Sequence, residues 1–466
     1  MEGIDKGKIF ETVKKVYLIG IGGIGMSGIA EYLVKQDFEV LGSDITLSEI
    51  TQRLEKLGVT VYKGHHENNL SDDTELVIYT SAVKEDNEEL KKAKRLKIKL
   101  MKRAEMLGHI VNDLYLIAVS GSHGKTTTTA MISKVLIDND YDPTVFVGGS
   151  LDFLEGGSSR IGKSKYAVVE ADEYDKSFLT LSSNLIVVTS IEKDHTDIYK
   201  SVEDLKENFK KFFDKRKTNS KVAGFGDDKN VIELLASYPK SEKVLYGFGA
   251  GNDVIAENVK QDNGNVHFST QGVEVELNVP GNHNVLNSLA AMVVCNEVGI
   301  GIDSFKESIK KFSGVQRRLQ LKFDGKIKIY DDYAHHPTEV EASLKALRAI
   351  KPGRIITVFQ PHLYSRTYDF YREFAGALTN SDVLILAKIY PAREKEIEGV
   401  SSKLIFDEFM KISDNDVCYL DEFKKIIHKL DEIVANGDLI VFQGAGDVTN
   451  LCDLYVKHLK SMSISV

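Results

Sequence analysis

Short apolar runs alternate along the chain with segments in which apolar residues recur every three to four positions. The first run, at residues 15–20, leads into a glycine-rich turn, a helix-period stretch from Ile24 to about Gln36, and a second run at 38–44. Such runs predict buried strands, and the longer period predicts amphipathic helices. Because strands separated by helices of about 10 to 15 residues form parallel sheets, this segment predicts a doubly wound domain that ends near Asn112.

The same rhythm restarts twice. A second series opens with an apolar run, a glycine-lysine turn and a Thr-rich helix, followed by two runs with the continuous apolar character of strands covered on both faces. From about Lys221 to Val279 the pattern becomes hairpin-like, before a helix that begins near Asn284. A third series fills the rest of the chain. We therefore expect three α/β domains, at residues 1–112, 113–318 and 319–466.

The composition of the 466-residue chain is that of a folded globular protein, with 42% apolar and 28% charged residues. Sixty Lys and Arg residues against 69 Asp and Glu residues give a net charge of −9, and no window concentrates the basic residues, so we expect no nucleic-acid partner. No apolar run approaches the about 18 residues of a membrane span, and we expect no membrane contact. Three scattered cysteines without zinc-ligand spacing favour a reducing cytoplasm.

Four glycines, Gly20, Gly22, Gly23 and Gly25, follow the first predicted strand with GxGxxG spacing. In this context a diphosphate can approach the bare backbone and lie on the N-terminus of the next helix. Asp44 ends the next strand, where an acidic residue binds ribose hydroxyls in dinucleotide folds. The same glycines would also let a helix contact a strand closely without any ligand. A dinucleotide and a sugar nucleotide fit this motif equally well.

Residues 120–126, Ser-Gly-Ser-His-Gly-Lys-Thr, form a sharper signal between an apolar strand and a helix. Successive backbone N–H groups and the Lys125 ammonium can surround the β- and γ-phosphates of ATP, and the Thr126 hydroxyl can bind Mg²⁺. Val119 stands where the longer P-loop pattern has its first glycine, so this loop is a shorter GxxGKT variant. An ordinary turn before a capped helix is the alternative. ATP is the ligand that the sequence supports best.

Acidic residues follow the two strands that should neighbour this loop. They are Glu170, Asp172 and Glu173 after one strand, and Asp194 and Asp197, with His195 next to Asp194, after the other. Both groups should open onto the nucleotide, because the carboxyl ends of parallel strands meet at one edge of a sheet. Each acid alone would serve a turn or a helix cap as readily, but Mg²⁺ prefers oxygen ligands. Together, beside a phosphate loop, they indicate a magnesium site.

Two further clusters are less specific. Residues 331–337, Asp-Asp-Tyr-Ala-His-His-Pro, follow a strand and would cap a helix as readily as they would serve catalysis. Residues 280–284, together with Asn287, open another helix and are equally consistent with a turn and an N-cap. The residues by themselves leave both choices open.

Taken in order, nine sequence blocks resemble the Mur ligase family over essentially the whole chain. They lie at residues 20–28, 121–129, 170–173, 191–197, 280–291, 316–320, 331–340, 359–367 and 390–394. Nine ordered blocks are far more specific than either glycine motif alone. Within the family, the segment from Gly25 to Gly28 resembles the members that add L-alanine more than the murein tripeptide recycling ligase.

The resemblance implies three domains: a Rossmann-like N-terminal domain that binds the UDP part of the substrate, a central P-loop ATPase-type domain and a Rossmann-like C-terminal domain. It implies a ligase that uses ATP and Mg²⁺ to join L-alanine to the carboxylate of UDP-N-acetylmuramate through an acyl phosphate. The expected setting is peptidoglycan precursor synthesis in the cytoplasm, by a monomer or a homodimer. Because the first glycine loop binds a UDP-sugar diphosphate in this family, no nicotinamide is expected.

The resemblance also assigns roles by motif. The UDP-sugar is expected to contact Gly20, Gly22, Gly23, Gly25, Met26, Ser27, Asp44 and Ser81. ATP is expected to contact Gly121, Ser122, His123, Gly124, Lys125, Thr126, Thr127, Asn284, Asn287, Arg318, Asp332 and Tyr333. The expected metal ligands are Thr126, Glu170 and His195. The expected catalytic residues are Lys125, Asp332, His335 and His336. For the two histidines this is a hypothesis from the reaction chemistry and not from the family, since a donor or cation near the developing oxyanion would lower the barrier.

Three alternatives stand beside this interpretation. The murein tripeptide recycling ligase belongs to the same family. An NAD-dependent dehydrogenase would explain the first glycine loop and Asp44, but neither the phosphate loop nor the acidic groups. A non-catalytic nucleotide switch would use the phosphate loop but has no need of a second diphosphate site. Two positions depart from the family pattern: Ser190, where Asn is usual, and Lys388, near which an acidic residue often stands.

Overall fold

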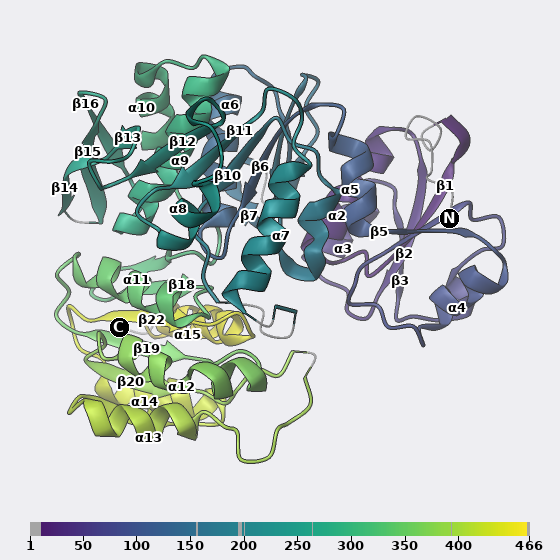
Figure 1. The fold of residues 1–466 in the computed structure, drawn as a ribbon. Coiled ribbons are helices and arrows are strands. Elements are labelled where there is room, and N and C mark those ends of the chain that lie inside the picture. The colour runs from purple at the N-terminus through teal and green to yellow at the C-terminus, as the bar shows by residue number, and fades with distance from the viewer. Residues whose placement is uncertain are drawn as a thin grey trace. The chain divides into compact units, whose positions relative to one another are not determined.

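The computed structural model describes residues 11–154, 157–193, 198–199, 201–262, 264–392 and 394–463. The chain divides into two compact units. Unit 1 comprises Met1–Ile255 and Asn287–Ser308, and unit 2 comprises Ala256–Leu286 and Ile309–Val466. The helices and strands of both units are labelled in Figure 1. The first two predicted domains thus lie largely within unit 1.

The first sheet of unit 1 has five strands in the order β3-β2-β1-β4-β5, and all its pairings are parallel. Its strands are β1 (Lys15–Ile19), β2 (Glu39–Asp44), β3 (Thr60–Lys63), β4 (Leu76–Tyr79) and β5 (Lys99–Lys102). Its helices are α2 (Ile24–Lys35), α3 (Glu49–Lys56), α4 (Glu88–Arg95) and α5 (Arg103–Val111), with the 3-10 turn η1 (Glu67–Asn69). The predicted doubly wound parallel sheet is confirmed.

The second sheet of unit 1 has eight strands in the order β13-β12-β11-β10-β6-β9-β7-β8, and only the β7–β8 pairing is antiparallel. The strands are β6 (Tyr115–Ser120), β7 (Thr144–Leu151), β8 (Gly157–Arg160), β9 (Tyr166–Glu170), β10 (Leu185–Val188), β11 (Lys221–Phe225), β12 (Lys243–Gly247) and β13 (Val254–Ile255). The intervening helices are α6 (Lys125–Asp138), η2 (Asp152–Leu154), η3 (Tyr174–Thr180), α7 (Val202–Asp214), α8 (Lys229–Leu235) and η4 (Lys240–Glu242).

The hairpin-like prediction for residues 221–279 is wrong for its first part. β11, β12 and β13 extend the parallel sheet, with α8 between the first two. Only β14 (Glu257–Asp262), β15 (Asn265–Thr270) and β16 (Val273–Leu277), which belong to unit 2, form an antiparallel sheet. A seven-residue helix such as α8 spans too few turns to display a clear 3.6-residue period.

The other sheet of unit 2 has six strands in the order β17-β18-β22-β19-β20-β21, parallel except for the β17–β18 pair. The strands are β17 (Gln320–Asp324), β18 (Lys328–Asp332), β19 (Ile355–Phe359), β20 (Val383–Leu386), β21 (Asp416–Tyr419) and β22 (Leu439–Gln443). The helices are α11 (Pro337–Arg348), α12 (Tyr364–Leu378), α13 (Lys403–Ile412), α14 (Phe423–Ile433) and α15 (Val448–Ser463). Two more helices, α9 (Asn282–Val298) and α10 (Ile302–Lys310), each contribute residues to both units.

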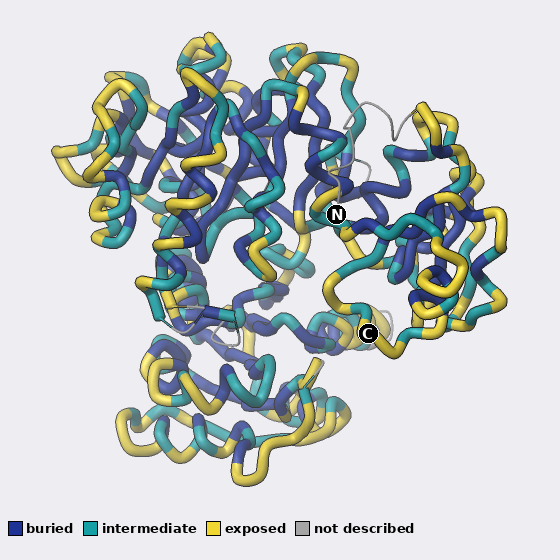
Figure 2. Tube along the Cα trace, turned by 45° about the vertical axis from the view of Figure 1, so that its right-hand side comes forward, coloured by how far each residue is buried: buried dark blue, intermediate teal, exposed yellow. Residues whose placement is uncertain are grey.

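The α/β fold class is confirmed, and the strands of the large sheets form the cores. Figure 2 shows buried chain along these strands and exposed chain at loops and outer helix turns. Residues of β6 and β10 such as Ile117, Val119 and Val187 are fully buried, as expected for strands covered on both faces. Among the described residues, no helix is long and apolar enough to cross a membrane. The carboxyl ends of the parallel strands carry the polar motifs described next.

Candidate active site

The phosphate loop, residues 121–126, leads from β6 into α6. Two of its glycines adopt backbone conformations with positive φ. Gly121 has a φ of 129° and Gly124 a φ of 82°. A Cβ atom on Gly121 would lie 2.2 Å from Thr189 Oγ1, and one on Gly124 would lie 2.6 Å from Asn287 Oδ1. Both the backbone conformation and the lack of space therefore require glycine at these positions.

The segment after β10 holds the phosphate loop from one side. Ser122 N donates to Ser190 O at 2.8 Å, and His123 N donates to Ser190 Oγ at 3.2 Å. Ser122 Oγ accepts from Glu192 N at 2.9 Å, and His123 Nε2 lies 3.5 Å from Glu192 Oε2. Ser190, which departs from the family pattern, thus supplies two hydrogen bonds that fix the loop. The other departure, Lys388, is exposed.

Lys125 folds back onto its own loop. Its Nζ donates to Gly121 O at 2.7 Å and to Glu173 Oε1 at 2.8 Å, and Glu173 is buried. Burial alone would lower the pKa of Lys125, but the negative charges of Glu173 and Asp172 outweigh it and hold the pKa above its ordinary value. The loop therefore contains a permanent cation with a buried carboxylate as its partner.

Thr126 and Glu170 meet beside the phosphate loop. Thr126 Oγ1 donates to Glu170 Oε1 at 3.0 Å, and Gly148 N donates to Glu170 Oε2 at 2.6 Å. Burial raises the pKa of Glu170, although the Lys125 charge opposes the shift. A hydroxyl and a carboxylate side by side are the oxygen donors that Mg²⁺ prefers, so these two residues fit the predicted metal site. His195, the third predicted ligand, lies outside the described residues, as do Asp194 and Asp197.

Three more predicted ATP residues lie on α6 and α9. Thr127 is half-buried in the first turn of α6. Asn287 Oδ1 accepts a hydrogen bond from Thr128 Oγ1 at 3.1 Å, which joins α9 to the helix of the phosphate loop. Asn284 precedes Asn287 by one turn of α9, belongs to unit 2, and donates from Nδ2 to Pro280 O at 2.7 Å.

The glycine loop, residues 20–25, connects β1 to α2. Gly20 N donates to Ser43 O at 2.8 Å, and Gly22 N donates to Asp44 Oδ2 at 2.9 Å. A Cβ atom on Gly22 would lie 2.9 Å from the same carboxylate oxygen. Asp44 therefore holds the loop from the end of β2, where the ribose-binding acid was predicted.

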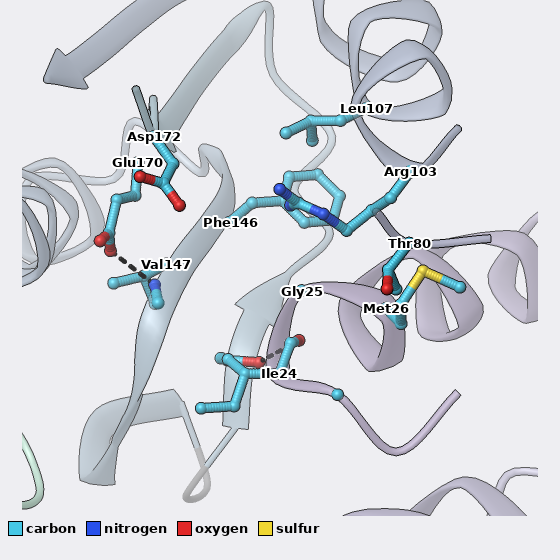
Figure 3. A pocket seen from close by; sticks show the side chains of 13 residues that line it. Ile24, Gly25, Met26, Thr80, Arg103, Leu107, Phe146, Val147, Glu170 and Asp172 are labelled. Atoms are coloured by element: carbon cyan, nitrogen blue, oxygen red, sulfur yellow. Dashed lines mark hydrogen bonds between the residues drawn. The ribbon is translucent and has the colours of Figure 1, made fainter. Parts of the chain in front are cut away.

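A pocket of about 250 Å³ lies beside the glycine loop. Its lining residues are Gly23, Ile24, Gly25, Met26, Thr80, Arg103, Leu107, Phe146, Val147, Gly148, Ser158, Glu170 and Asp172. Figure 3 shows Arg103 entering from α5, with Glu170 and Asp172 on another wall and the hydrogen bond from Gly148 to Glu170 as a dashed line. The pocket thus joins one end of the glycine loop to the predicted metal carboxylate.

The pocket separates the predicted UDP-sugar residues into two groups. Gly23, Gly25 and Met26 line it. Ser27 is fully buried and donates to Ile24 O at 2.9 Å, and Ser81 is exposed outside the lining. Gly20, Gly22 and Asp44 also lie outside the lining.

Sequence reasoning missed the lining residues Arg103, Phe146 and Gly148. One signal pointed to Arg103, since it is the first residue of α5 and a cation is electrostatically unfavourable at a helix N-terminus. Phe146 and Gly148 lie within the continuous strand β7, and the sequence carries no comparable signal for them.

Unit 2 brings together three of its predicted ATP residues. Asp332 accepts hydrogen bonds from Leu319 N at 3.2 Å and Gln443 Nε2 at 3.1 Å, and burial raises the pKa of Asp332. The guanidinium of Arg318 lies 4.9 Å from the centre of the Tyr333 ring. The Arg317 guanidinium lies 4.8 Å from the same ring centre, so two cations contact one aromatic ring.

The two adjacent histidines have different surroundings. His335 Nδ1 lies 2.9 Å from Tyr333 O and 3.3 Å from Glu339 Oε2. His336 is the N-cap residue of α11, and its Nδ1 accepts from Thr338 N at 3.4 Å. The predicted helix cap therefore exists, with Pro337 in the first turn. This role is compatible with the catalytic prediction and does not test it.

Three family descriptions match successive parts of the chain. They are "Mur ligase family, catalytic domain" at residues 15–115, "Mur ligase middle domain" at 119–295 and "Mur ligase, glutamate ligase domain" at 317–446. These matches support the predicted three-domain α/β architecture, and they leave the dehydrogenase alternative without support.

Similar proteins agree with the family matches. The UDP-N-acetylmuramate–L-alanine ligase of Acetivibrio thermocellus is 42% identical over 97% of each chain. That of Sulfurihydrogenibium sp. is 40% identical over 96% of this chain and 98% of its own. The crystal structure of the UDP-N-acetylmuramate–alanine ligase from Thermotoga maritima has a TM-score of 0.83 at 28% identity, over 96% of this chain and 99% of that one. The chain belongs to the Mur ligase family, whose members are ATP-dependent ligases.

Proposed function

We propose that the protein joins L-alanine to the carboxylate of UDP-N-acetylmuramate while ATP is cleaved to ADP and phosphate, in peptidoglycan precursor synthesis. One observation carries this proposal. A single pocket is lined by the first turn of α2 and by Glu170, and Glu170 accepts a hydrogen bond from Thr126 of the phosphate loop. A sugar nucleotide on the glycine loop can therefore extend its acid group toward the end of the nucleotide.

The chemistry of amide formation explains why two such loops are needed. A carboxylate at neutral pH is a poor electrophile, so its oxygen must become a leaving group before an amine can attack. Transfer of the γ-phosphoryl group of ATP to the muramoyl carboxylate gives an acyl phosphate. The neutral amine of alanine then attacks the acyl carbon, and the tetrahedral intermediate expels phosphate as the amide forms.

The phosphate loop supplies the positioning and charge on which phosphoryl transfer depends. In the proposed complex, Lys125 exchanges its contact with Glu173 for the ATP phosphates, and backbone N–H groups of residues 121–124 surround them. The hydrogen bonds of Ser122 N and His123 N to Ser190 support this role, because a loop held in place before binding loses little freedom when it binds.

Thr126 and Glu170 would hold Mg²⁺, together with His195. The ion, when bound, neutralises charge on the phosphates and on the transferring group. The protein's own contribution is orientation, since Gly148 N fixes one oxygen of Glu170 and leaves the other toward Thr126.

The residues of unit 2 have proposed roles at the nucleotide and at the incoming amine. Asn284, Arg318, Asp332 and Tyr333 are proposed to contact ATP with Asn287. His335 and His336 are proposed to stabilise the oxyanion of the tetrahedral intermediate. The hydrogen bond of His335 to Tyr333 O supports this role, because it fixes the orientation of the imidazole.

The recycling ligase is the second candidate within the family. A murein peptide ligase from Psychrobacter arcticus has a TM-score of 0.70 at 21% identity over 95% of this chain and 98% of its own, a likeness that reflects the fold alone. The alanine ligases named above share about twice that identity over similar coverage. Alanine addition is therefore the better supported proposal.

Three further properties belong to the proposal. The domain boundaries are proposed near residues 112 and 318. The protein is proposed to act in the cytoplasm, which its three free cysteines, Cys295, Cys418 and Cys452, support. It is proposed to be a monomer or a homodimer that binds neither nucleic acid nor membrane.

Phosphate release by the purified protein tests the proposed function. Each of UDP-N-acetylmuramate, UDP-N-acetylglucosamine and no nucleotide sugar is combined with ATP, Mg²⁺ and one amino acid or the murein tripeptide. We expect release only with UDP-N-acetylmuramate and an amino acid, and fastest with L-alanine. Release that needs the tripeptide would favour the recycling ligase, and release without any nucleotide sugar would refute both.

A further inference from the structure

We infer that Arg103 of α5 binds the diphosphate of the nucleotide sugar and thereby determines the direction in which this substrate occupies the pocket. The inference rests on the proposed function, because it deepens the role of the same pocket. Neither the glycine motif nor the phosphate-loop motif includes Arg103.

The first argument is the position of the guanidinium. Arg103 Nη1 lies 2.8 Å from the point where a Cβ atom on Gly25 would stand, so it adjoins the first turn of α2. Figure 3 shows Arg103 and Gly25 among the residues that line the pocket. Since a helix N-terminus attracts anions, the guanidinium and the start of α2 favour the same kind of ligand.

The second argument is the lack of a protein partner. Among the described residues, none accepts a hydrogen bond from Arg103 and none forms an ion pair with it. The adjacent Lys102, in contrast, lies 3.5 Å from Asp175 Oδ2 and does not line the pocket. An unpaired guanidinium on a pocket wall, at a helix position that disfavours a cation, is best explained by an anionic ligand.

The third argument is the distribution of charge around the pocket. Arg103 and the glycine loop form one wall, while Glu170 and Asp172 lie on another (Figure 3). UDP-N-acetylmuramate carries a diphosphate at one end of its sugar and a carboxylate on the lactyl group. With the diphosphate beside Arg103, the carboxylate is left for the wall where Mg²⁺ and ATP are proposed to bind. In the reverse orientation the diphosphate would lie against the carboxylates of Glu170 and Asp172, away from the guanidinium of Arg103.

Calorimetric binding of UDP and of UDP-N-acetylmuramate tests this inference without requiring turnover. Arg103→Met keeps the length of the side chain but removes its charge and donors. We expect both ligands to lose affinity by the same factor, about 10- to 100-fold, because both contain the diphosphate. Arg103→Lys should restore part of the loss, since an ammonium keeps the charge but cannot donate in a bidentate manner.

Lys102→Met is the matched control, because it removes a cation from the neighbouring position outside the pocket. Its affinity for both ligands should stay within twofold of the wild type. ATP affinity should be unchanged in every variant. Unchanged UDP affinity in Arg103→Met would overturn the inference, including the case in which only UDP-N-acetylmuramate binds more weakly, which would assign Arg103 to the carboxylate. If Arg103→Met loses affinity for UDP but the wild type does not ligate alanine, the proposed function is refuted and the inference about Arg103 still holds.

Discussion

The two glycine-rich loops of unit 1 share an architecture but obtain their positive charge differently. Each follows a buried parallel strand and opens a helix, α2 in the glycine loop and α6 in the phosphate loop. The phosphate loop contains its own cation, Lys125, with Glu173 as its partner. The glycine loop contains no basic residue, and the guanidinium beside it comes from α5.

This difference separates two ways of binding a phosphate group. Lys125 is part of the phosphate loop itself, so it can stabilise the charge that develops on a transferring phosphoryl group. A cation supplied by another helix can fix a diphosphate that does not react. We therefore expect loss of the cation in the phosphate loop to reduce kcat, and loss of the cation beside the glycine loop to raise the KM for the nucleotide sugar.

The largest effect should follow from Lys125→Ala. Without its fixed cation, the site loses stabilisation of the transferring phosphoryl group, and kcat for phosphate release should fall by about 10³-fold. Lys134→Ala is the control, because Lys134 lies on the same helix but pairs with Asp138. A Lys125→Ala enzyme with turnover within tenfold of the wild type would contradict the role assigned to the loop.

The next effect concerns the metal. Glu170→Gln keeps the hydrogen bond with Thr126 possible but removes the negative charge proposed to bind Mg²⁺. The Mg²⁺ concentration for half-maximal activity should rise by about 100-fold, while the affinity for UDP stays constant. Glu207→Gln on α7, where Glu207 pairs with Lys211, serves as control. An unchanged Mg²⁺ titration would remove Glu170 from the metal site.

Most of the fold could be predicted from the sequence, because apolar runs and helical periodicity are patterns of residues that are neighbours in the sequence. The strands β1 and β2 coincide with the predicted apolar runs at residues 15–20 and 38–44. The prediction was wrong at residues 221–247, where two parallel strands flank a very short helix. The pairing of β11 with β10 joins segments distant in sequence, and no local pattern reports it.

The phosphate loop could likewise be predicted because its functional atoms are consecutive in the sequence. Lys125, Thr126 and the two glycines lie within one turn and its helix. The pocket beside the glycine loop could not, since Arg103, Gly148 and Glu170 come from three different elements. Only the folded chain shows that Gly148 donates to Glu170 and that Arg103 adjoins Gly25.

A pair of glycine substitutions should separate the two loops by ligand. Gly121→Ala would place a Cβ atom 2.2 Å from Thr189 Oγ1 and should weaken ATP binding by about tenfold. Gly22→Ala would place one 2.9 Å from Asp44 Oδ2 and should weaken UDP binding by a similar factor. Gly58→Ala is the control for Gly121→Ala. Gly58 also has a positive φ, of 92°, but no atom lies within 4 Å of its added Cβ, so this variant measures the effect of the backbone conformation without a steric clash. If either loop variant weakens both ligands equally, the loops do not act separately.

The smallest expected effect concerns a buried network behind the glycine loop. Ser43 O accepts from Gly20 N, and Ser43 Oγ donates to Glu89 Oε2 at 2.6 Å. Glu89 is fully buried and also accepts from Tyr17 Oη at 2.9 Å and from Asn69 Nδ2 at 2.9 Å. His65 Nδ1 lies 3.2 Å from Glu89 Oε2, and this hydrogen bond raises the pKa of His65 above its ordinary value.

Because the pKa of His65 is raised on folding, its contribution to stability is complete below about pH 6.5 and is lost as the pH rises through the folded-state pKa. We expect a loss of less than about 1 kcal/mol, which lowers Tm by about 1–3 °C between pH 6 and pH 8. His65→Asn should remove this component, whereas His428→Asn, whose side chain is 80% exposed, should keep it. ATP affinity should not follow the same change, because the pKa of Lys125 is also raised and its charge persists throughout this interval. An equal pH dependence of Tm in wild type and His65→Asn would show that the network does not link His65 to the stability of the first sheet.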